Sequence, residues 1–525
     1  MKLEIKNIEE IKKLVDKAPT FDVSKLREDS IKDPKWLAFG SGNIFRGYIA
    51  RIAQDLVDAG DFDRGISVVE TFDEEIIEKI YRPYDNLAVS VSLNKDGKFD
   101  TNLIANLAEA LTLADMDRIK EIFLNPNLQI ASFTITEKGY NLYAPNGELM
   151  DVVKEDLAND PSDAKHLMSI VTSMLYKRFK DIGKGLTLLS LDNCSQNGDR
   201  IKESVMLVAK SWNEDGKVED DFITYLESDV SFPWTMIDKI TPRPAKEVKD
   251  YVEGLGFEEM DPVITSKNTY IAPFVNSEET EYLVIEDDFK NGRPDFTKAG
   301  VYLTDRDKVN KVEKMKVTTC LNPLHTTLAT YGCVLGYGSI ADEMKDEDLV
   351  SLIKKIGYDE ALPVVVDPEI LNPKDFIDEV INVRLPNPFI PDTPQRIATD
   401  TSQKMAIRFG ETIKSYIEDE DKDVKDLKYI PLAIAGWVRY LLGVDDEGNK
   451  FELSPDPLME ELQKDLEGIA LGEFKETDGL NKLLGNKNIF GLDLEEIGLS
   501  DLVKKYIEEL SEKTGSVRET LKKYL

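Results

Sequence analysis

One short segment near the start of the chain limits the possible fold more than any other. Residues 36–39 form an apolar run typical of a buried strand, and they lead directly into Gly40-Ser41-Gly42. From residue 44 to 57 apolar residues then recur at helical spacing, and Gly60 stands where a glycine commonly ends a helix. A strand, a glycine turn and a helix in this order predict the first unit of a parallel α/β sheet.

The alternation of strands and helices continues to about residue 300 and is then replaced by helices alone. Residues 66–70, 128–136 and 186–193 also have the composition of strands, and each carries polar groups at its carboxyl end. Strand signals largely vanish after about residue 300. Amphipathic helices are predicted instead over residues 328–362, 376–383, 402–417, 431–442 and 502–525. The sequence therefore predicts an α/β Rossmann-type domain over residues 1–300 and a mostly α-helical domain over residues 301–525.

Composition excludes several classes of function. The chain has 525 residues and a formal charge of −34, which argues against nucleic acid or an anionic membrane as partner, because both attract positive charge. An anionic substrate would need a local cluster of cations. No secretory signal and no membrane span is visible, so we expect a cytoplasmic protein. Two histidines and three cysteines show no metal-ligand spacing, so we predict no metal and a reducing compartment.

The glycine turn suggests a dinucleotide site. Gly40 and Gly42 at the start of a helix let backbone N–H groups approach a phosphate closely, although an ordinary strand-to-helix turn has the same pattern. Glu70, at the end of the second strand, could accept a hydrogen bond from the adenosine ribose and would repel a 2′-phosphate, which favours NAD over NADP. Arg46, one turn into the helix, could contact phosphate or simply lie on the surface.

A second group of reactive residues lies near residue 320. Lys316, Asn322 and His325 place a general base, an amide and an imidazole within ten residues. The structural alternative is that Asn322 caps a helix whose first residue is proline, and that Lys316 is an ordinary surface lysine. Arg396 and Lys404 are two helical turns apart, so they could share one face or form a surface pair.

These segments together resemble the long-chain polyol and uronate dehydrogenases, the family of mannitol 2-dehydrogenase. The matching segments, in family order, are residues 39–46, 133–140, 192–198, 232–242, 285–294, 316–325, 387–388, 396–404 and 435–440. The resemblance implies a Rossmann-type domain and a helical domain with the active site between them, NAD as cofactor and no metal.

The resemblance also implies roles for individual residues. The catalytic group is expected to be Lys316 as general acid/base, Asn193 and Asn322 as donors to the reacting oxygen, and His325 as a contact to the sugar. Substrate-binding residues are expected at Asp238, Arg396 and Lys404. The cofactor-binding set is expected to be Gly40, Gly42, Asn43, Ile44, Arg46, Glu70 and Thr134.

One departure from the family pattern concerns the lysine. Most relatives place it five residues before the asparagine, whereas Lys316 and Asn322 are six apart. We expect a one-residue insertion in the turn formed by residues 318–320 to restore the geometry.

The best-matching branch of the family interconverts D-mannonate and D-fructuronate. In that reaction Arg396, Lys404 and Arg243 would pair with the substrate carboxylate. Alternatives are an uncharged polyol such as mannitol, the epimeric tagaturonate, or a dinucleotide sensor without catalysis. The expected partner is a small sugar acid or polyol, and the expected state is a monomer or a small homo-oligomer.

Overall fold

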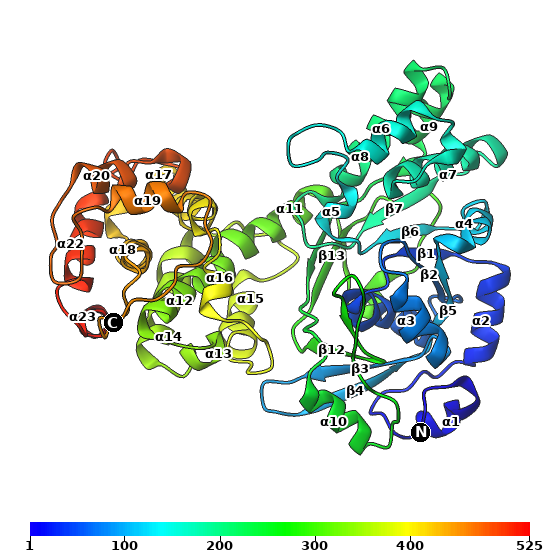
Figure 1. The fold of residues 1–525 in the computed structure, drawn as a ribbon, viewed down its shortest axis with the longest axis horizontal. Helices are drawn as coiled ribbons and strands as arrows, with labels where there is room; N and C mark the ends of the chain where they lie inside the picture. The colour runs from blue at the N-terminus through cyan, green and yellow to red at the C-terminus, as the bar shows by residue number, and fades with distance from the viewer. The chain divides into compact units, whose positions relative to one another are not determined.

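The computed structural model describes residues 1–525 and divides into two compact units, Met1–Asn310 and Lys311–Leu525. The division falls within helix α11 (Arg306–Met315), ten residues beyond the domain boundary expected from the sequence. All strands lie in the first unit, and the last of them is β14 (Tyr302–Thr304). The second unit consists of helices and connecting turns (Figure 1).

The centre of the first unit is a six-stranded parallel sheet in the order β5-β2-β1-β6-β7-β8. Its strands are β1 (Trp36–Phe39), β2 (Ile66–Glu70), β5 (Leu107–Thr112), β6 (Ile130–Phe133), β7 (Leu186–Ser190) and β8 (Val230–Ser231). Numbered along the chain this is the order 3-2-1-4-5-6, which confirms the Rossmann-type prediction. The strand order reverses between β1 and β6, and ligands of such sheets bind outside the carboxyl ends at that point.

Both faces of this sheet are buried. Along β1, Trp36 and Ala38 join one hydrophobic core, and Leu37 and Phe39 join the other, as the two-residue period of a strand requires. The first core is completed by helix α3 (Ala50–Asp58), and the second by α7 (Leu167–Asp181) and α8 (Asn197–Glu214) (Figure 1). Burial on both faces explains why β1 reads as a continuous apolar run.

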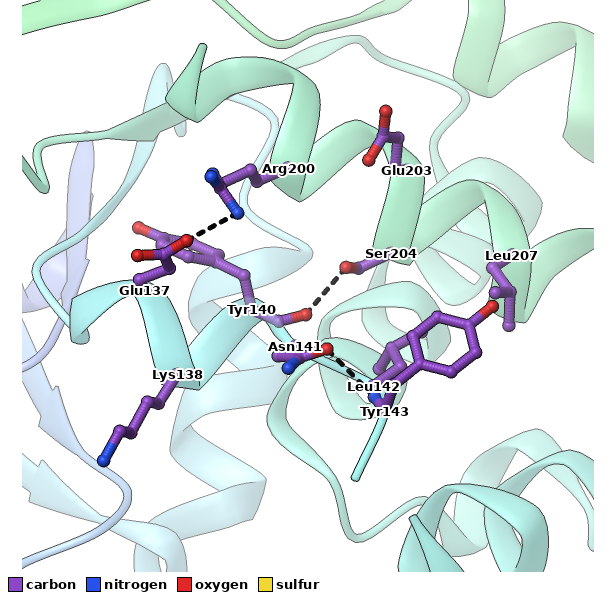
Figure 2. Close-up of a pocket in the computed structure, with 10 residues that line it drawn as sticks. All are labelled: Glu137, Lys138, Tyr140, Asn141, Leu142, Tyr143, Arg200, Glu203, Ser204 and Leu207. Atoms are coloured by element: carbon purple, nitrogen blue, oxygen red, sulfur yellow. Dashed lines mark hydrogen bonds and ion pairs between the residues drawn. The ribbon is translucent and has the colours of Figure 1, made fainter. Parts of the chain in front are cut away.

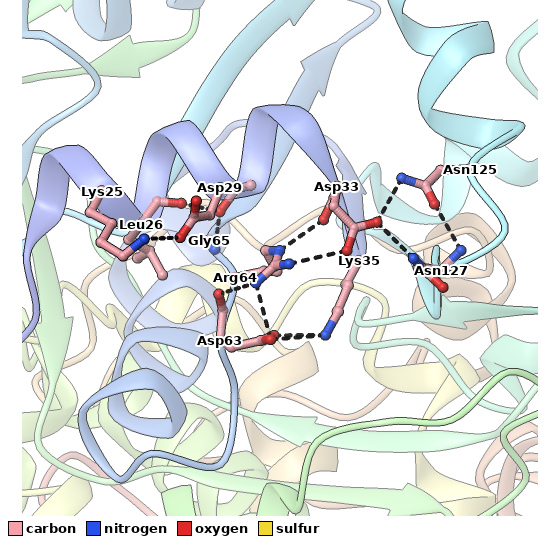
Figure 3. A network of polar contacts seen from close by, with 11 residues as sticks. Lys25, Leu26, Asp29, Asp33, Lys35, Asp63, Arg64, Gly65, Asn125 and Asn127 are labelled. Carbon is pink, nitrogen blue, oxygen red and sulfur yellow. Dashed lines mark hydrogen bonds and ion pairs between the residues drawn. The ribbon is translucent and has the colours of Figure 1, made fainter.

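A polar network fastens the amino ends of the central strands (Figure 3). The Asp33 carboxylate accepts hydrogen bonds from Arg64 at 3.1 Å and from Asn127 at 2.9 Å. The Lys35 ammonium pairs with Asp63 at 2.8 Å. These residues belong to the loops that precede β1, β2 and β6. The amino edge of the sheet is therefore held by ion pairs, and the glycine turn lies at the opposite edge.

Smaller sheets extend the first unit. The sheet β14-β13-β9 contains β13 (Tyr282–Glu286) and β9 (Thr235–Asp238), and the sheet β12-β3-β4 contains β12 (Phe274–Glu278), β3 (Ala88–Leu93) and β4 (Phe99–Ile104). A short hairpin joins β10 (Val263–Ile264) to β11 (Tyr270–Ile271). Strand β9 places Asp238 at its carboxyl end.

Helix α18 (Tyr429–Leu441) is the core of the second unit, because all its residues from Ile430 onward are buried. It packs against α12 (Asn322–Leu335) and α22 (Ser500–Leu510). The approach to α12 is close: a Cβ atom at Gly436 would lie 2.3 Å from the ring of Tyr331.

Three predicted helices are wrong in their extent. The segment 328–362 is broken at Gly336, whose φ of +77° ends α12 and separates it from α13 (Ile340–Glu343) and α14 (Glu347–Lys354). The segment 502–525 divides into α22, which ends at Leu510, and α23 (Ser516–Tyr524), which follows Gly515 at a φ of +83°. Residues 402–417 divide into the π-helical turn η13 (Ala406–Gly410) and helix α17 (Glu411–Glu418).

Candidate active site

The glycine turn after β1 has a conformation that only glycine tolerates at its first position. Gly40 has a φ of +97°, and a Cβ atom there would lie 2.2 Å from the carbonyl oxygen of Thr134. Thr134 donates from its amide to Phe39 O at 2.8 Å and from its hydroxyl to Gly40 O at 3.1 Å. Gly42 differs, because a Cβ atom there would meet nothing within 4 Å. Gly42 therefore leaves open space above the turn.

Glu70 holds this turn in place. One carboxylate oxygen accepts from the amide of Ser41 at 3.0 Å and from its hydroxyl at 2.6 Å. The other oxygen accepts from the amides of Phe72 at 3.0 Å and Asp73 at 3.1 Å. The side chain of Glu70 is thus engaged by four protein donors, whereas the sequence predicted a ribose as its partner.

Arg46 is not placed as a direct phosphate contact. It is fully buried and donates to Ala272 O at 2.8 Å and to the side-chain oxygen of Asn43 at 3.1 Å. Burial lowers the pKa of Arg46 to about 10, so it remains charged at neutral pH. The sequence prediction of a phosphate contact is replaced by a structural role, because the guanidinium fastens Asn43 and the segment before β12 beneath the turn.

The turn nevertheless has the features that a dinucleotide requires. The amides in the first turn of the helix starting near Asn43 lack acceptors within that helix and carry its positive dipole end. They lie at the carboxyl edge of the sheet, beside the point where the strand order reverses. Gly42 lets a pyrophosphate approach the backbone. These features fit a dinucleotide, with Glu70 contributing negative charge near the end of β2.

A cavity of about 300 Å³ opens at the carboxyl ends of β6 and β7 in the first unit, and its lining includes Ile44, Thr136, Asn193 and Lys239. The Asn193 side chain is exposed and lines the cavity. The preceding residue, Asp192, holds the wall by accepting from the amide of Thr136 at 3.0 Å. This cavity leaves the carboxamide of Asn193 available to a bound molecule.

Asp238 lies beside this cavity but is itself buried at the end of β9. The next residue, Lys239, lines the cavity and pairs with Glu281 at 2.8 Å. Burial lowers the pKa of Lys239, and the Glu281 carboxylate opposes that shift. Arg243, predicted to pair with a carboxylate, stacks 4.2 Å from the ring centroid of Tyr270.

A second cavity, of about 430 Å³, lies between α5 (Thr136–Tyr140) and α8 (Figure 2). Part of its polar lining is already paired, since Arg200 pairs with Glu137 at 2.8 Å, and Ser204 donates to the carbonyl of Tyr140 at 2.7 Å. The smaller cavity, in contrast, is lined by residues that follow β1, β6 and β7, where the strand order of the sheet reverses. We therefore regard the smaller cavity, which holds Asn193, as the functional one.

In the second unit, Lys316 begins the π-helical turn η8 (Lys316–Cys320) and is buried, with 6% of its surface exposed. The amide of Leu321 donates to Lys316 O at 3.1 Å, an i to i+5 bond that accommodates one residue more than an α-helical turn. This local geometry agrees with the expected one-residue insertion between Lys316 and Asn322. Asn322 and Pro323 are the first two residues of α12, as the structural alternative predicted, but the side chain of Asn322 makes no cap bond.

His325 lies one turn further along α12, on the same side as Asn322. Its Nε2 atom is 3.3 Å from an Asp392 oxygen but forms no hydrogen bond. Burial lowers the pKa of His325 to about 3, and the charges of Arg384, Arg408 and Arg396 add to this shift. The imidazole is therefore neutral at physiological pH. It can donate a hydrogen bond to a hydroxyl group or accept one from it.

The predicted cations do not share one helix face. Arg396 lies in the short helix α16 (Pro394–Ile397), and Asp400, with a φ of +54°, separates it from Lys404. Both still belong to the region around His325: Arg396 pairs with Asp392, and burial and Arg408 lower the pKa of Lys404. The prediction of a shared helix face was wrong because α16 ends at Ile397, and the left-handed Asp400 turns the chain before Lys404.

Sequence reasoning missed two cations of this cluster, Arg384 and Arg408. Arg384 follows α15 (Pro373–Glu379) in the turn η11 (Val380–Arg384), and nothing in its neighbouring sequence points to it. Arg408 lies four residues after Lys404, a spacing that could have been noted. With Arg396, Lys404 and Lys316 they place five cationic side chains around the start of α12.

The structure contains no group of histidine, cysteine, aspartate and glutamate side chains arranged to hold a metal ion. None of its helices combines the length and hydropathy that crossing a bilayer requires.

Comparison with known proteins assigns the family. The model of the mannitol dehydrogenase Rossmann domain matches residues 34–298, and that of the mannitol dehydrogenase C-terminal domain matches residues 308–512. A D-mannonate oxidoreductase from Thermotoga maritima is 52% identical over 96% of this chain and 94% of its own length.

Two solved structures have the same fold. The substrate-free crystal structure of a D-sorbitol dehydrogenase has a TM-score of 0.81 at 25% identity, and covers 98% of this chain and 99% of that chain. The complex of Pseudomonas fluorescens mannitol 2-dehydrogenase with NAD and D-mannitol has a TM-score of 0.71 at 24% identity, over 100% of this chain and 99% of that chain. The family models and the Thermotoga relative confirm the resemblance seen in the sequence: the chain belongs to the mannitol dehydrogenase family.

Proposed function

We propose that this protein is an NAD-dependent oxidoreductase that interconverts D-mannonate and D-fructuronate. The observation that carries the proposal is the cluster of five cationic side chains around the start of α12, in a chain whose formal charge is −34. An uncharged polyol would not need such a cluster, whereas a sugar acid requires local positive charge to overcome the negative surface. The Thermotoga maritima relative, a D-mannonate oxidoreductase, supports the same substrate pair.

The first unit is proposed to bind the dinucleotide. The helix beginning near Asn43 faces the pyrophosphate with its positive end, and Gly42 permits close approach. Glu70 disfavours a 2′-phosphate through its charge, so we expect a preference for NAD over NADP. When bound, the nicotinamide supplies or accepts the hydride.

The second unit is proposed to manage the proton and the sugar. Lys316 removes the proton from the reacting hydroxyl of D-mannonate, and returns it to the oxygen during reduction of D-fructuronate. Asn322 donates to that oxygen as negative charge develops on it. We assign a donor role to Asn193 as well, because its exposed carboxamide lines the cavity of the first unit. Neutral His325 contacts the sugar hydroxyls, and Arg396 and Lys404 bind the substrate.

The test is a spectrophotometric comparison of D-fructuronate, D-tagaturonate and D-fructose with NADH and with NADPH. The proposal predicts the highest kcat/KM for D-fructuronate with NADH. Fastest turnover of D-fructose would overturn the sugar-acid assignment, and fastest turnover of D-tagaturonate would move the assignment to the epimer. Faster oxidation of NADPH than of NADH would overturn the cofactor assignment.

A further inference from the structure

Arg408 is partly buried, and it differs from the fully buried arginines in how its guanidinium is hydrogen-bonded. Arg178 and Arg439 are fully buried and each donates to several backbone carbonyls. Arg408 lies in η13, and its guanidinium donates only to the hydroxyl of Thr326. A guanidinium carries five N–H donors, so most of the hydrogen-bonding capacity of Arg408 is unused by the protein. Such a group is suited to a planar anion that accepts two parallel bonds.

The contacts of Arg408 place its guanidinium near the start of α12. The segment η13 packs against both η8 and α12. Thr326, which holds the guanidinium, donates its own hydroxyl to the carbonyl of Asn322 at 2.8 Å. Asn322, His325 and Thr326 are three and four residues apart, so they share one face of the helix. Arg408 is therefore fixed next to the face that carries the two residues proposed to contact substrate.

The neighbouring cations are less free than Arg408. Arg396 already pairs with Asp392, and 61% of its side chain is exposed. The ammonium of Lys404 donates to the carbonyl of Thr399 at 2.5 Å. Arg408 has no carboxylate partner, and its positive charge acts on both His325 and Lys404.

We propose that Arg408 is the residue that binds the carboxylate of the sugar acid, and that it selects uronates over uncharged ketoses. This inference rests on the proposed function and assigns its substrate specificity to one side chain. The carboxylate receives two parallel hydrogen bonds from the guanidinium, which Thr326 holds in orientation. Arg396 and Lys404 then supply the surrounding positive field and contacts to hydroxyl groups.

The experiment compares D-fructuronate with D-fructose, which carries a CH₂OH group in place of the carboxylate. We expect Arg408→Gln to lower kcat/KM for D-fructuronate about 10- to 100-fold, the size of a lost charge-assisted interaction, while kcat/KM for D-fructose changes less than about 3-fold. Arg408→Lys keeps the charge but not the paired donors, so its ratio of the two kcat/KM values should fall between wild type and Arg408→Gln.

The control is Lys414→Gln, which also removes one positive charge, but from a lysine paired with Glu411 on α17. Its ratio should equal that of wild type. The inference would be overturned if Arg408→Gln lowered kcat/KM equally for both sugars. It would also be overturned if the ratio of kcat/KM for D-fructuronate to kcat/KM for D-fructose stayed at the wild-type value in both Arg408 variants. Should Arg408→Gln fail to fold, the Arg408→Lys ratio decides alone. If wild type itself reduces D-fructuronate no faster than D-fructose, the proposed function fails, which is a separate result.

Discussion

Replacement of Glu70 by glutamine distinguishes two roles for this residue. In the structure its two oxygens accept from the amide and hydroxyl of Ser41 and from the amides of Phe72 and Asp73. Glutamine keeps the shape but replaces one acceptor by an NH₂ group. In the less costly orientation this group faces Ser41, whose hydroxyl can turn to accept, and the Ser41 amide then loses its partner.

The magnitude follows from these bonds. One orphaned buried amide costs about 1–3 kcal/mol, and each of the two remaining bonds weakens by about 1 kcal/mol when its acceptor loses its charge. We therefore expect Glu70→Gln to lower the free energy of unfolding of the first unit by about 3–5 kcal/mol. NADH binding should weaken as well, because the turn that faces the pyrophosphate loses its support.

Urea unfolding without cofactor measures this change, followed by tryptophan fluorescence, to which Trp36, Trp212 and Trp234 contribute from the first unit and Trp437 from the second. Ser41→Ala is the matched control. It removes only the hydroxyl bond and should cost about 1–2 kcal/mol. If Glu70→Gln unfolds within about 0.5 kcal/mol of wild type and only the preference for NAD over NADP changes, then Glu70 acts on the ribose and the structural role is wrong.

Two further predictions concern Gly42 and Glu343. Gly42→Ala should leave the Tm unchanged, because a Cβ atom there meets nothing within 4 Å, and should weaken NADH binding in a fluorescence titration; unchanged binding would show that no ligand approaches this backbone. Glu343 is fully buried without a hydrogen-bond partner, and burial raises its pKa well above the usual 4.5. Between the ordinary pKa of 4.5 and the higher folded pKa, the Glu343 carboxyl is protonated in the folded protein and ionised in the unfolded chain. The free energy of unfolding therefore falls as the pH rises through this range. Urea unfolding at several pH values should show Glu343→Gln gaining on wild type by about 1.4 kcal/mol per pH unit in this window, and a pH-independent difference would mean that Glu343 is ionised when folded.

The strands of the first unit could be predicted because their environment leaves a simple pattern. β1 is buried on both faces and reads as four apolar residues, and β2 ends at the acidic residue that closes its run. Helix ends in the second unit were harder to predict. Gly336 stops α12 by a left-handed conformation, whereas α22 ends at Leu510 without a glycine and Gly332 and Gly436 lie within helices, so glycine alone does not mark the break.

Site residues could be predicted where they belong to a sequence motif, and could not be predicted where only tertiary packing brings them together. The glycine turn, Lys316, Asn322 and His325 are close in sequence or match the family pattern. The partners of Glu70 are mainly backbone amides in turns. Every residue except proline has such an amide, so the sequence does not show which ones Glu70 binds. Arg384 and Arg408 reach His325 from turns about 60 and 80 residues further along the chain, and only the packing of η13 and α12 brings Arg408 to Thr326.

The most direct test of the proposed chemistry is the rate of NADH oxidation by D-fructuronate in Lys316→Ala, with Lys314→Ala as control. Lys314 is exposed and lies 3.6 Å from Glu411, so its removal should leave the rate within about 2-fold of wild type. Lys316→Ala should lose at least about 100-fold in kcat while binding NADH as tightly as wild type. Wild-type turnover in Lys316→Ala, or an equal loss in Lys314→Ala, would contradict the assignment of the proton transfer to Lys316.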